Sequence, residues 1–153
     1  MTKFDFEDGN GPVPAHQHSN GNGWVADTAE VAKTAFVGSD AKVYGNARVY
    51  DNAQVFGKAK VYHDAWVSSN AWVSSNAKVY GNAWVFGDAS VYGNASVYGD
   101  AKVFGDAEVY GWAKVFGNAW VYGNAKVYGD AKVFDNARFY GYAWVCGSKP
   151  EEE

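Results

Sequence analysis

The sequence predicts an all-β protein whose chain forms one solenoid of short, stacked strands. From Val25 to Val145 a valine, or once a phenylalanine, recurs every six residues without an insertion, and an alanine follows nearly every one at the fourth position after it. Self-similarity at a fixed spacing is the signature of a stacked repeat. The chain contains no leucine and no isoleucine, so valine and alanine must fill a narrow core that has the same small volume in every coil.

The repeat unit reads Ala-x-Val-[Tyr/Phe]-Gly-[Asn/Asp], which places valine inward, its neighbours outward and a turn at the last two positions. This pattern resembles the hexapeptide repeat of left-handed parallel β-helices, as found in bacterial acyltransferases and γ-class carbonic anhydrases. The resemblance implies a single left-handed parallel β-helix, a triangular solenoid of about seven 18-residue coils, although parallel crossovers are otherwise right-handed. The chain departs from that family after the inward residue, where Tyr or Phe replaces the frequent glycine.

The chain divides into three parts. Residues 1–23 lie off the repeat and are predicted to form a short N-terminal capping segment, because the end of a repeat array exposes unpaired strand edges. Residues 24–147 form the repeat itself, in which Phe139 enlarges the core near its end and Tyr142 interrupts the turn pattern. Residues 148–153 form an acidic C-terminal tail whose proline and charges stop further strand pairing.

The turn positions carry Asn or Asp in most units, for example Asn46, Asp64 and Asp88, and a glycine usually comes just before. We expect these Asn and Asp residues to adopt positive φ, since they tolerate the left-handed region. One carboxylate per turn does not converge on a cation, so the sequence predicts neither a metal site nor a cofactor.

Taking every third unit sorts the outward residues onto three faces. The first face carries a lysine column, Lys42, Lys60, Lys78, Lys114 and Lys132, beside Tyr44, Tyr62, Tyr80, Tyr98, Phe116 and Phe134. The second carries Arg48, Trp66, Trp84, Lys102, Trp120 and Arg138 beside Tyr50, Ser68, Phe86, Phe104, Tyr122 and Tyr140. The third carries Gln54, Trp72, Ser90, Glu108, Lys126 and Trp144 beside Phe56, Ser74, Tyr92, Tyr110 and Tyr128.

The aromatic columns have two explanations. Rings one strand spacing apart can stack and stabilise neighbouring coils. So many outward rings also exceed the apolar patch of a usual monomer, which indicates a covering partner: another copy of the chain, with a trimer implied by the resemblance, another protein or a carbohydrate. The second face is the predicted contact surface. Its anchors are Trp66, Trp84 and Trp120, with Arg48 and Arg138 at the ends.

One coil interrupts the aromatic columns. Ser68 and Ser74 replace the ring in two successive units, and the same coil carries His63, Trp66 and Trp72. The sequence therefore predicts notches in which a flat ring, from a sugar or a base, could stack on tryptophan while a serine hydroxyl binds its edge. Drift of the repeat, or room for a side chain of a neighbouring subunit, explains the same serines.

The residues that catalysis needs are sparse. By resemblance, an acyltransferase of this fold needs a catalytic histidine and a projecting loop, but the repeat contains no insertion and His63 is its only histidine. A zinc enzyme would need three histidines in register, whereas His16 and His18 lie in the capping segment and their role is left open. The lone Cys146 fits a reducing compartment, and the start of the chain shows no secretory signal, so we expect a cytoplasmic protein without a membrane segment.

Three functions follow as hypotheses. The first is a non-catalytic, rigid binding or assembly scaffold that engages a partner through its aromatic faces. The second is an acyltransferase that uses His63 with a substrate near Ser68 and Ser74. The third is an inhibitor or decoy that binds a nucleic-acid-processing complex, although a net charge of −4 argues against direct nucleic-acid binding.

Overall fold

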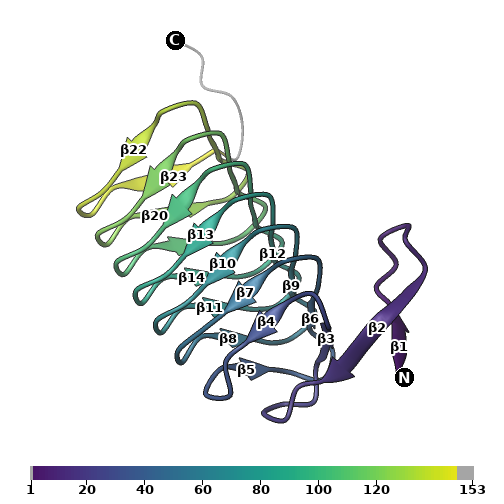
Figure 1. Cartoon of the computed structure of the whole chain (residues 1–153). Helices are drawn as coiled ribbons and strands as arrows, with labels where there is room; N and C mark the ends of the chain where they lie inside the picture. The colour runs from purple at the N-terminus through teal and green to yellow at the C-terminus, as the bar shows by residue number, and fades with distance from the viewer. Residues whose placement is uncertain (1, 148–153) are drawn as a thin grey trace.

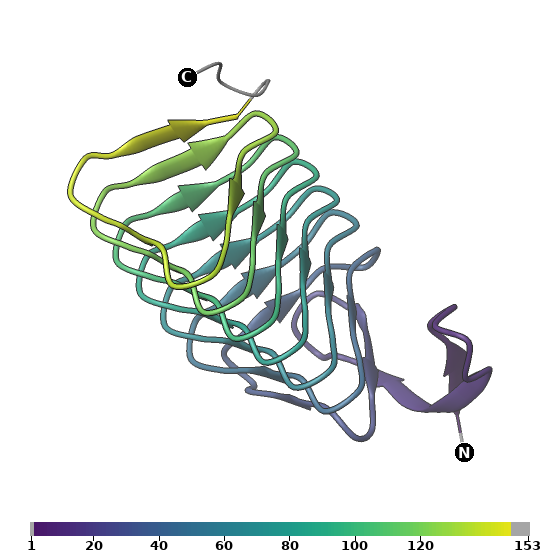
Figure 2. The ribbon, with the colours of Figure 1, turned by 90° about the horizontal axis from the view of Figure 1, so that it is seen from above.

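The computed structural model describes residues 2–147, which form strands and turns and no helix. The strands stack into one parallel β-solenoid (Figure 1), and Figure 2 shows the successive coils lying in register above one another. The predicted all-β solenoid of about seven 18-residue coils is confirmed, while the left-handed sense of the coil stays a prediction. The predicted acidic tail, 148–153, lies outside the described residues.

Three sheets run along the solenoid. The first face is a nine-stranded sheet in the order β1 (Lys3–Asp5), β2 (Pro12–Gln17), β3 (Trp24–Ala26), β6 (Lys42–Val43), β9 (Lys60–Val61), β12 (Lys78–Val79), β15 (Ser96–Val97), β18 (Lys114–Val115) and β21 (Lys132–Val133). The second face contains β4 (Glu30–Val31), β7 (Arg48–Val49), β10 (Trp66–Val67), β13 (Trp84–Val85), β16 (Lys102–Val103), β19 (Trp120–Val121) and β22 (Arg138–Phe139). The third contains β5 (Phe36–Val37), β8 (Gln54–Val55), β11 (Trp72–Val73), β14 (Ser90–Val91), β17 (Glu108–Val109), β20 (Lys126–Tyr128) and β23 (Trp144–Cys146).

The register keeps equivalent residues of successive coils directly opposite each other. Val79 pairs with Val61 on one side and with Val97 on the other, and the outward Lys78 pairs with Lys60 in the same way. The same offset holds on the other two faces, where Trp66 pairs with Trp84. Sorting every third unit onto one face is therefore correct.

The core consists of valine and alanine only over most of its length. The inward valines from Val37 to Val127 have no exposed surface, and the alanines at the corners are equally buried. Each buried valine contributes about 1.5–3 kcal/mol relative to an exposed one. Because each coil donates and accepts backbone hydrogen bonds along the axis, as from Lys42 N–H to Ala59 O, the valine layers are held at a constant spacing.

The prediction of positive φ at the Asn and Asp column was wrong. The residue just before that column has positive φ, for example Gly81 at 67°, and the Asn and Asp residues do not. This residue also lies against the next coil: a Cβ on Gly81 would come within 2.9 Å of the backbone nitrogen of Gly99. Glycine is favoured there both by the backbone angle and by the close approach of the two coils.

The N-terminal residues form a hairpin against the first coil. Strand β1 pairs antiparallel with β2, and β2 pairs antiparallel with β3, so that the edge of the first-face sheet at this end is formed by the hairpin (Figure 1). Phe6 is only 1% exposed and stacks on Tyr44 at 4.8 Å, and Phe4 stacks on Trp24 at 4.6 Å. The hairpin thus adds rings to the outer surface of the first face.

The last coil is the least buried part of the repeat. Phe139 and Val145 are half-buried, although both pack against the valine core. Tyr142 stands at a turn position and is 81% exposed, and Trp144 is also exposed. The core is therefore closed less completely here than in the middle coils.

Candidate functional site

The aromatic column of the first face forms a continuous ladder. From Phe6 to Phe134 its neighbouring rings lie 4.8–5.4 Å apart and nearly parallel, with the members Phe6, Tyr44, Tyr62, Tyr80, Tyr98, Phe116 and Phe134. The stacking expected from the sequence is confirmed. Burial between neighbouring rings, together with Tyr80, raises the pKa of Tyr62 to about 12. Successive rings of this column contact each other, so no gap for a ligand is left between them.

The raised pKa of Tyr62 predicts a loss of stability in alkali. The unfolded chain ionises this phenol near pH 10, whereas the folded protein keeps it neutral until about pH 12, so stability falls as the pH rises through that interval. In denaturant titrations between pH 9 and 12, the free energy of unfolding of Tyr62→Phe should fall less with rising pH than that of the wild type. The exposed Tyr140 provides the control, because Tyr140→Phe should reproduce the wild-type profile. Identical profiles for Tyr62→Phe and the wild type would contradict the prediction.

The second face brings together the tryptophans and arginines that the sequence singled out. Trp66 and Trp84 stack on each other at 4.9 Å. The Arg48 guanidinium lies 5.4 Å from the ring centre of Trp66, and that of Arg138 lies 4.4 Å from Trp120. The cations of this column therefore occupy positions over the indole faces of their own neighbours.

Lys102 completes this arrangement, since its ammonium lies 5.1 Å from the rings of both Trp84 and Trp120. Ser68 leaves a hollow between Trp66, Trp84 and Phe86, but the hollow measures only about 130 Å³. On the second face the rings and the cations thus contact one another, and little free space is left between them.

The third face contains a larger opening at Ser74. After the opening the rings of this column stack again, since Tyr92 lies 4.9 Å from Tyr110. At Ser74 the ring is missing, so Phe56 and Tyr92 lie two strand spacings apart, about 9.6 Å. A hollow of about 380 Å³ occupies this position, and we call it the third-face slot. Its lining consists of Phe56, Trp72, Ser74, Ser90, Tyr92 and Glu108.

Trp72 forms one side of the slot. Its ring packs edge-on against Phe56 at 5.8 Å, and 48% of its surface stays exposed. The neighbours of Trp72 on the adjacent coils are Gln54 and Ser90, so neither indole face is covered by a ring of its own column. A second hollow, of about 340 Å³, lies on its other side between Asn70 and Asp88. Trp72 thus presents an aromatic surface with open space on both sides.

Polar groups stand at the rim of the slot. The Tyr92 hydroxyl donates a 2.9 Å hydrogen bond to Glu108, whose other carboxylate oxygen accepts one from Lys126 at 3.1 Å. Burial, and then the hydrogen bond to the Glu108 carboxylate, raise the pKa of the Tyr92 phenol. These contacts hold Tyr92 and Glu108 in place beside the hydroxyls of Ser74 and Ser90.

The histidines have structural contacts. His63 has a positive φ of 58°, accepts a 3.3 Å hydrogen bond from Gly81 N–H, and packs edge-on against Tyr62. His16 lies 2.7 Å from the Asp27 carboxylate, and the buried His18 bonds to the Ala35 carbonyl at 2.8 Å. Within residues 2–147 no three His, Cys, Asp or Glu side chains lie close enough together to hold a metal ion.

The predicted notch of Ser74 and Trp72 lies between Phe56 and Tyr92, as expected from the sequence; the structure adds Ser90 and Glu108 to it and leaves Ser68 with a much smaller hollow. The two serines can be told apart in the sequence by the residue that pairs, one coil later, with the tryptophan next to each serine. Trp66 is followed by Trp84, which covers it, whereas Trp72 is followed by the small Ser90.

The comparisons with known proteins agree with the fold. Residues 41–57 match the family model described as YdcK beta solenoid repeat, and this stretch spans nearly one coil, from the turn before β6 to the turn after β8. A search of curated proteins and a search of solved structures each found no match. Nowhere between residues 2 and 147 does the chain form a helix that could span a membrane.

Proposed function

We propose that the protein is a non-catalytic, rigid binding scaffold that binds carbohydrate in the third-face slot. The observation that supports this proposal is the missing ring of the aromatic column at Ser74, between Phe56 and Tyr92 and beside the exposed Trp72. The second face, which the sequence favoured, is the weaker candidate for ring binding, because its cations already cover the indoles.

The dimensions of the slot suit one flat ring. Rings in the uninterrupted columns stack at 4.8–4.9 Å, so a gap of two strand spacings accommodates one inserted ring in contact with both neighbours. The backbone hydrogen bonds from Ser74 N–H to Val91 O and from Phe56 N–H to Val73 O set this gap. A ring that enters therefore meets a preformed site and orders few protein groups.

The rim favours a sugar over an aromatic base. A sugar presents apolar C–H groups on the faces of its ring and hydroxyls around its edge. The slot provides aromatic surfaces from Trp72 and Tyr92 with hydroxyls of Ser74 and Ser90 and the Glu108 carboxylate close by. A few placed polar groups in an aromatic pocket are the usual means of orienting such a ligand.

Filling the gap with a protein ring tests the proposal. Calorimetric titrations with a panel of β-1,4-linked hexasaccharides of glucose, xylose, mannose and N-acetylglucosamine should show binding of at least one of them. Ser74→Tyr should abolish that binding while raising the free energy of unfolding by about 0.5–1.5 kcal/mol, because the new ring stacks on Tyr92. A ring fits beside the tryptophan here, since Trp84 with Phe86 and Trp120 with Tyr122 already form such pairs.

Two control variants separate the slot from the rest of the aromatic surface. Ser68→Tyr makes the same change on the second face and should leave binding intact. Trp72→Ala should weaken binding at least about tenfold, whereas Trp112→Ala, which removes a 64% exposed indole outside the slot, should not. Carbohydrate binding that survives Ser74→Tyr, or no binding of any of the four sugars at millimolar concentration, overturns the proposal.

Several finer expectations from the sequence stay proposals. These are membership of the hexapeptide-repeat transferase family, acyl transfer at His63, a protein partner or a trimer contact through Trp66, Trp84 and Trp120, a decoy role towards a nucleic-acid-processing complex, and a cytoplasmic location. The hydrogen bond that His63 accepts from Gly81 gives its ring a structural role, which weighs against its use as a general base.

A further inference from the structure

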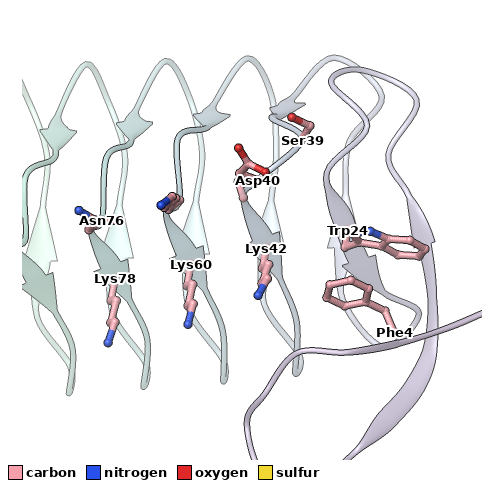
Figure 3. A pocket seen from close by; sticks show the side chains of 10 residues that line it. Phe4, Trp24, Ser39, Asp40, Lys42, Lys60, Asn76 and Lys78 are labelled. Carbon is pink, nitrogen blue, oxygen red and sulfur yellow. The ribbon is translucent and has the colours of Figure 1, made fainter.

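Four lysines gather in a groove beside the first face, away from the third-face slot. The groove has a volume of about 610 Å³ and lies next to the N-terminal hairpin (Figure 3). Its cations are Lys42, Lys60 and Lys78 from strands β6, β9 and β12, and Lys58 from the turn before β9. We call it the lysine groove.

The three strand lysines form a row. They pair in register across successive coils, so their backbones lie about 4.8 Å apart, and Figure 3 shows their side chains extending in parallel from the sheet. Lys58 lies two residues before Lys60 and is the only cation in the turn column that otherwise carries mostly Asn and Asp. This replacement is the signal in the sequence that marks the groove.

Three carboxylates lie near these four cations. The Glu7 carboxylate lies 3.9 Å from the Lys42 ammonium and is largely exposed, Asp8 lines an adjoining hollow together with Lys60 and Lys78, and Asp40 lines the groove (Figure 3). In the described part of the chain, Lys58, Lys60 and Lys78 form no ion pair within 4 Å. Burial, and then the neighbouring Lys42 and Lys78, lower the pKa of Lys60, while Glu7 acts in the opposite direction.

The row of lysines in the groove is short. At the hairpin end the stacked rings of Phe4 and Trp24 form a wall (Figure 3). Beyond Lys78 the next residue of the column is Ser96, which interrupts the row of charges. The row therefore spans three coils, about 10 Å. Beyond Ser96 the column resumes with Lys114 and Lys132, but there Asp130 takes the turn position that Lys58 has in the groove, so a short anion stays where the cations are densest.

We propose that the lysine groove binds a short chain of phosphate groups, as in inorganic triphosphate or a nucleoside triphosphate. Lysine binds phosphate as a compact point charge with three donors, so three in a row with Lys58 beside them match several adjacent phosphoryl groups. A bound anion also removes the repulsion within the row. The wall of Phe4 and Trp24 lies where a base attached to the last phosphate would meet aromatic rings.

The test compares two lysine pairs of the same column. Titration calorimetry with inorganic triphosphate at low salt should give saturable binding that weakens as salt is raised. Lys60→Gln with Lys78→Gln should raise the Kd at least about tenfold. Lys114→Gln with Lys132→Gln removes the same charge from the same face beyond Ser96 and should change the Kd less than about twofold. If the first double variant does not fold, Lys58→Gln at the exposed turn should still weaken binding at least about threefold.

Adenosine triphosphate provides the second arm of the experiment. Tighter binding of the nucleotide than of inorganic triphosphate identifies a base that contacts the Phe4 and Trp24 wall, and equal affinity identifies the phosphate chain as the whole ligand. Absence of binding of both compounds at low salt would overturn the proposal. An equal loss of affinity in the two lysine double variants would also overturn it, because it would show that the anion responds only to the overall charge of the face.

Discussion

Replacement of Val97 by phenylalanine is expected to lower the free energy of unfolding by about 3 kcal/mol or more, because a middle coil cannot widen. Val97 has no exposed surface and is paired in register with Val79 and Val115 on the neighbouring coils. The hydrogen bonds on both sides of each strand hold every coil in register with the two coils next to it, so one coil cannot widen alone without breaking them. Extra volume must therefore be accommodated by off-rotamer side chains or by broken hydrogen bonds. Chemical denaturation monitored by circular dichroism measures the loss.

Position in the solenoid is the control for this substitution. The half-buried Val145 lies in the last described coil, where Phe139 already replaces a valine without being fully enclosed. Val145→Phe should therefore cost less than about 1 kcal/mol. A cost for Val97→Phe that is as small as the cost at Val145 would show that the core can expand in the middle coils.

The second large effect is expected for Phe6→Ala, which should detach the N-terminal hairpin. Phe6 is 1% exposed and stacks between Phe4, edge-on at 4.9 Å, and Tyr44 at 4.8 Å. Removing a buried phenylalanine costs about 3–5 kcal/mol, which is more than a two-stranded hairpin gains from its own strand pairing. The substitution should therefore open the hairpin locally and leave the solenoid folded.

Hydrogen exchange distinguishes this local opening from global unfolding. In Phe6→Ala, amides of β1, β2 and β3 that bond across the hairpin should exchange at least about a hundredfold faster, while those of the middle coils keep their protection. Phe134→Ala, at the other end of the same ladder and 46% exposed in the wild type, should leave exchange in the hairpin unchanged. Uniformly faster exchange in Phe6→Ala would instead mean that hairpin and solenoid unfold as one unit.

The same hairpin connects stability with the lysine groove. Phe4, which packs against Phe6, also forms part of the groove wall, and the Lys42 ammonium lies 5.6 Å from its ring centre. Phe6→Ala should therefore lower the affinity for adenosine triphosphate more than the affinity for inorganic triphosphate, because only the nucleotide has a base that meets the wall. Carbohydrate binding in the third-face slot lies outside the hairpin contacts and should not change.

The sequence by itself determined the strands, their register and the sorting of outward residues onto three faces. The strands of the repeat follow one another at a constant spacing, so a given position of the unit always faces the same way. The pairing of Trp66 with Trp84 and of Trp72 with Ser90 illustrates this. The stacking of Tyr62 on Tyr80 follows from the same spacing. In such a repeat, local pattern and long-range contact carry the same information.

Only the tertiary structure decided where the pattern leaves space and where the backbone adopts positive φ. Positive φ lies at Gly81 rather than at Asn82, and the same angle occurs at Asp51 and His63 in the column of Gly81, so composition does not reveal which of the two turn residues adopts it. The residue one coil later distinguishes Ser68 from Ser74 in the sequence, but the volumes of about 130 Å³ and 380 Å³ depend on how the surrounding side chains pack. The lysine groove exists because a hairpin outside the repeat packs its rings beside the lysine column. Contacts between non-repeating and repeating segments follow no period, and therefore no sequence spacing predicts them.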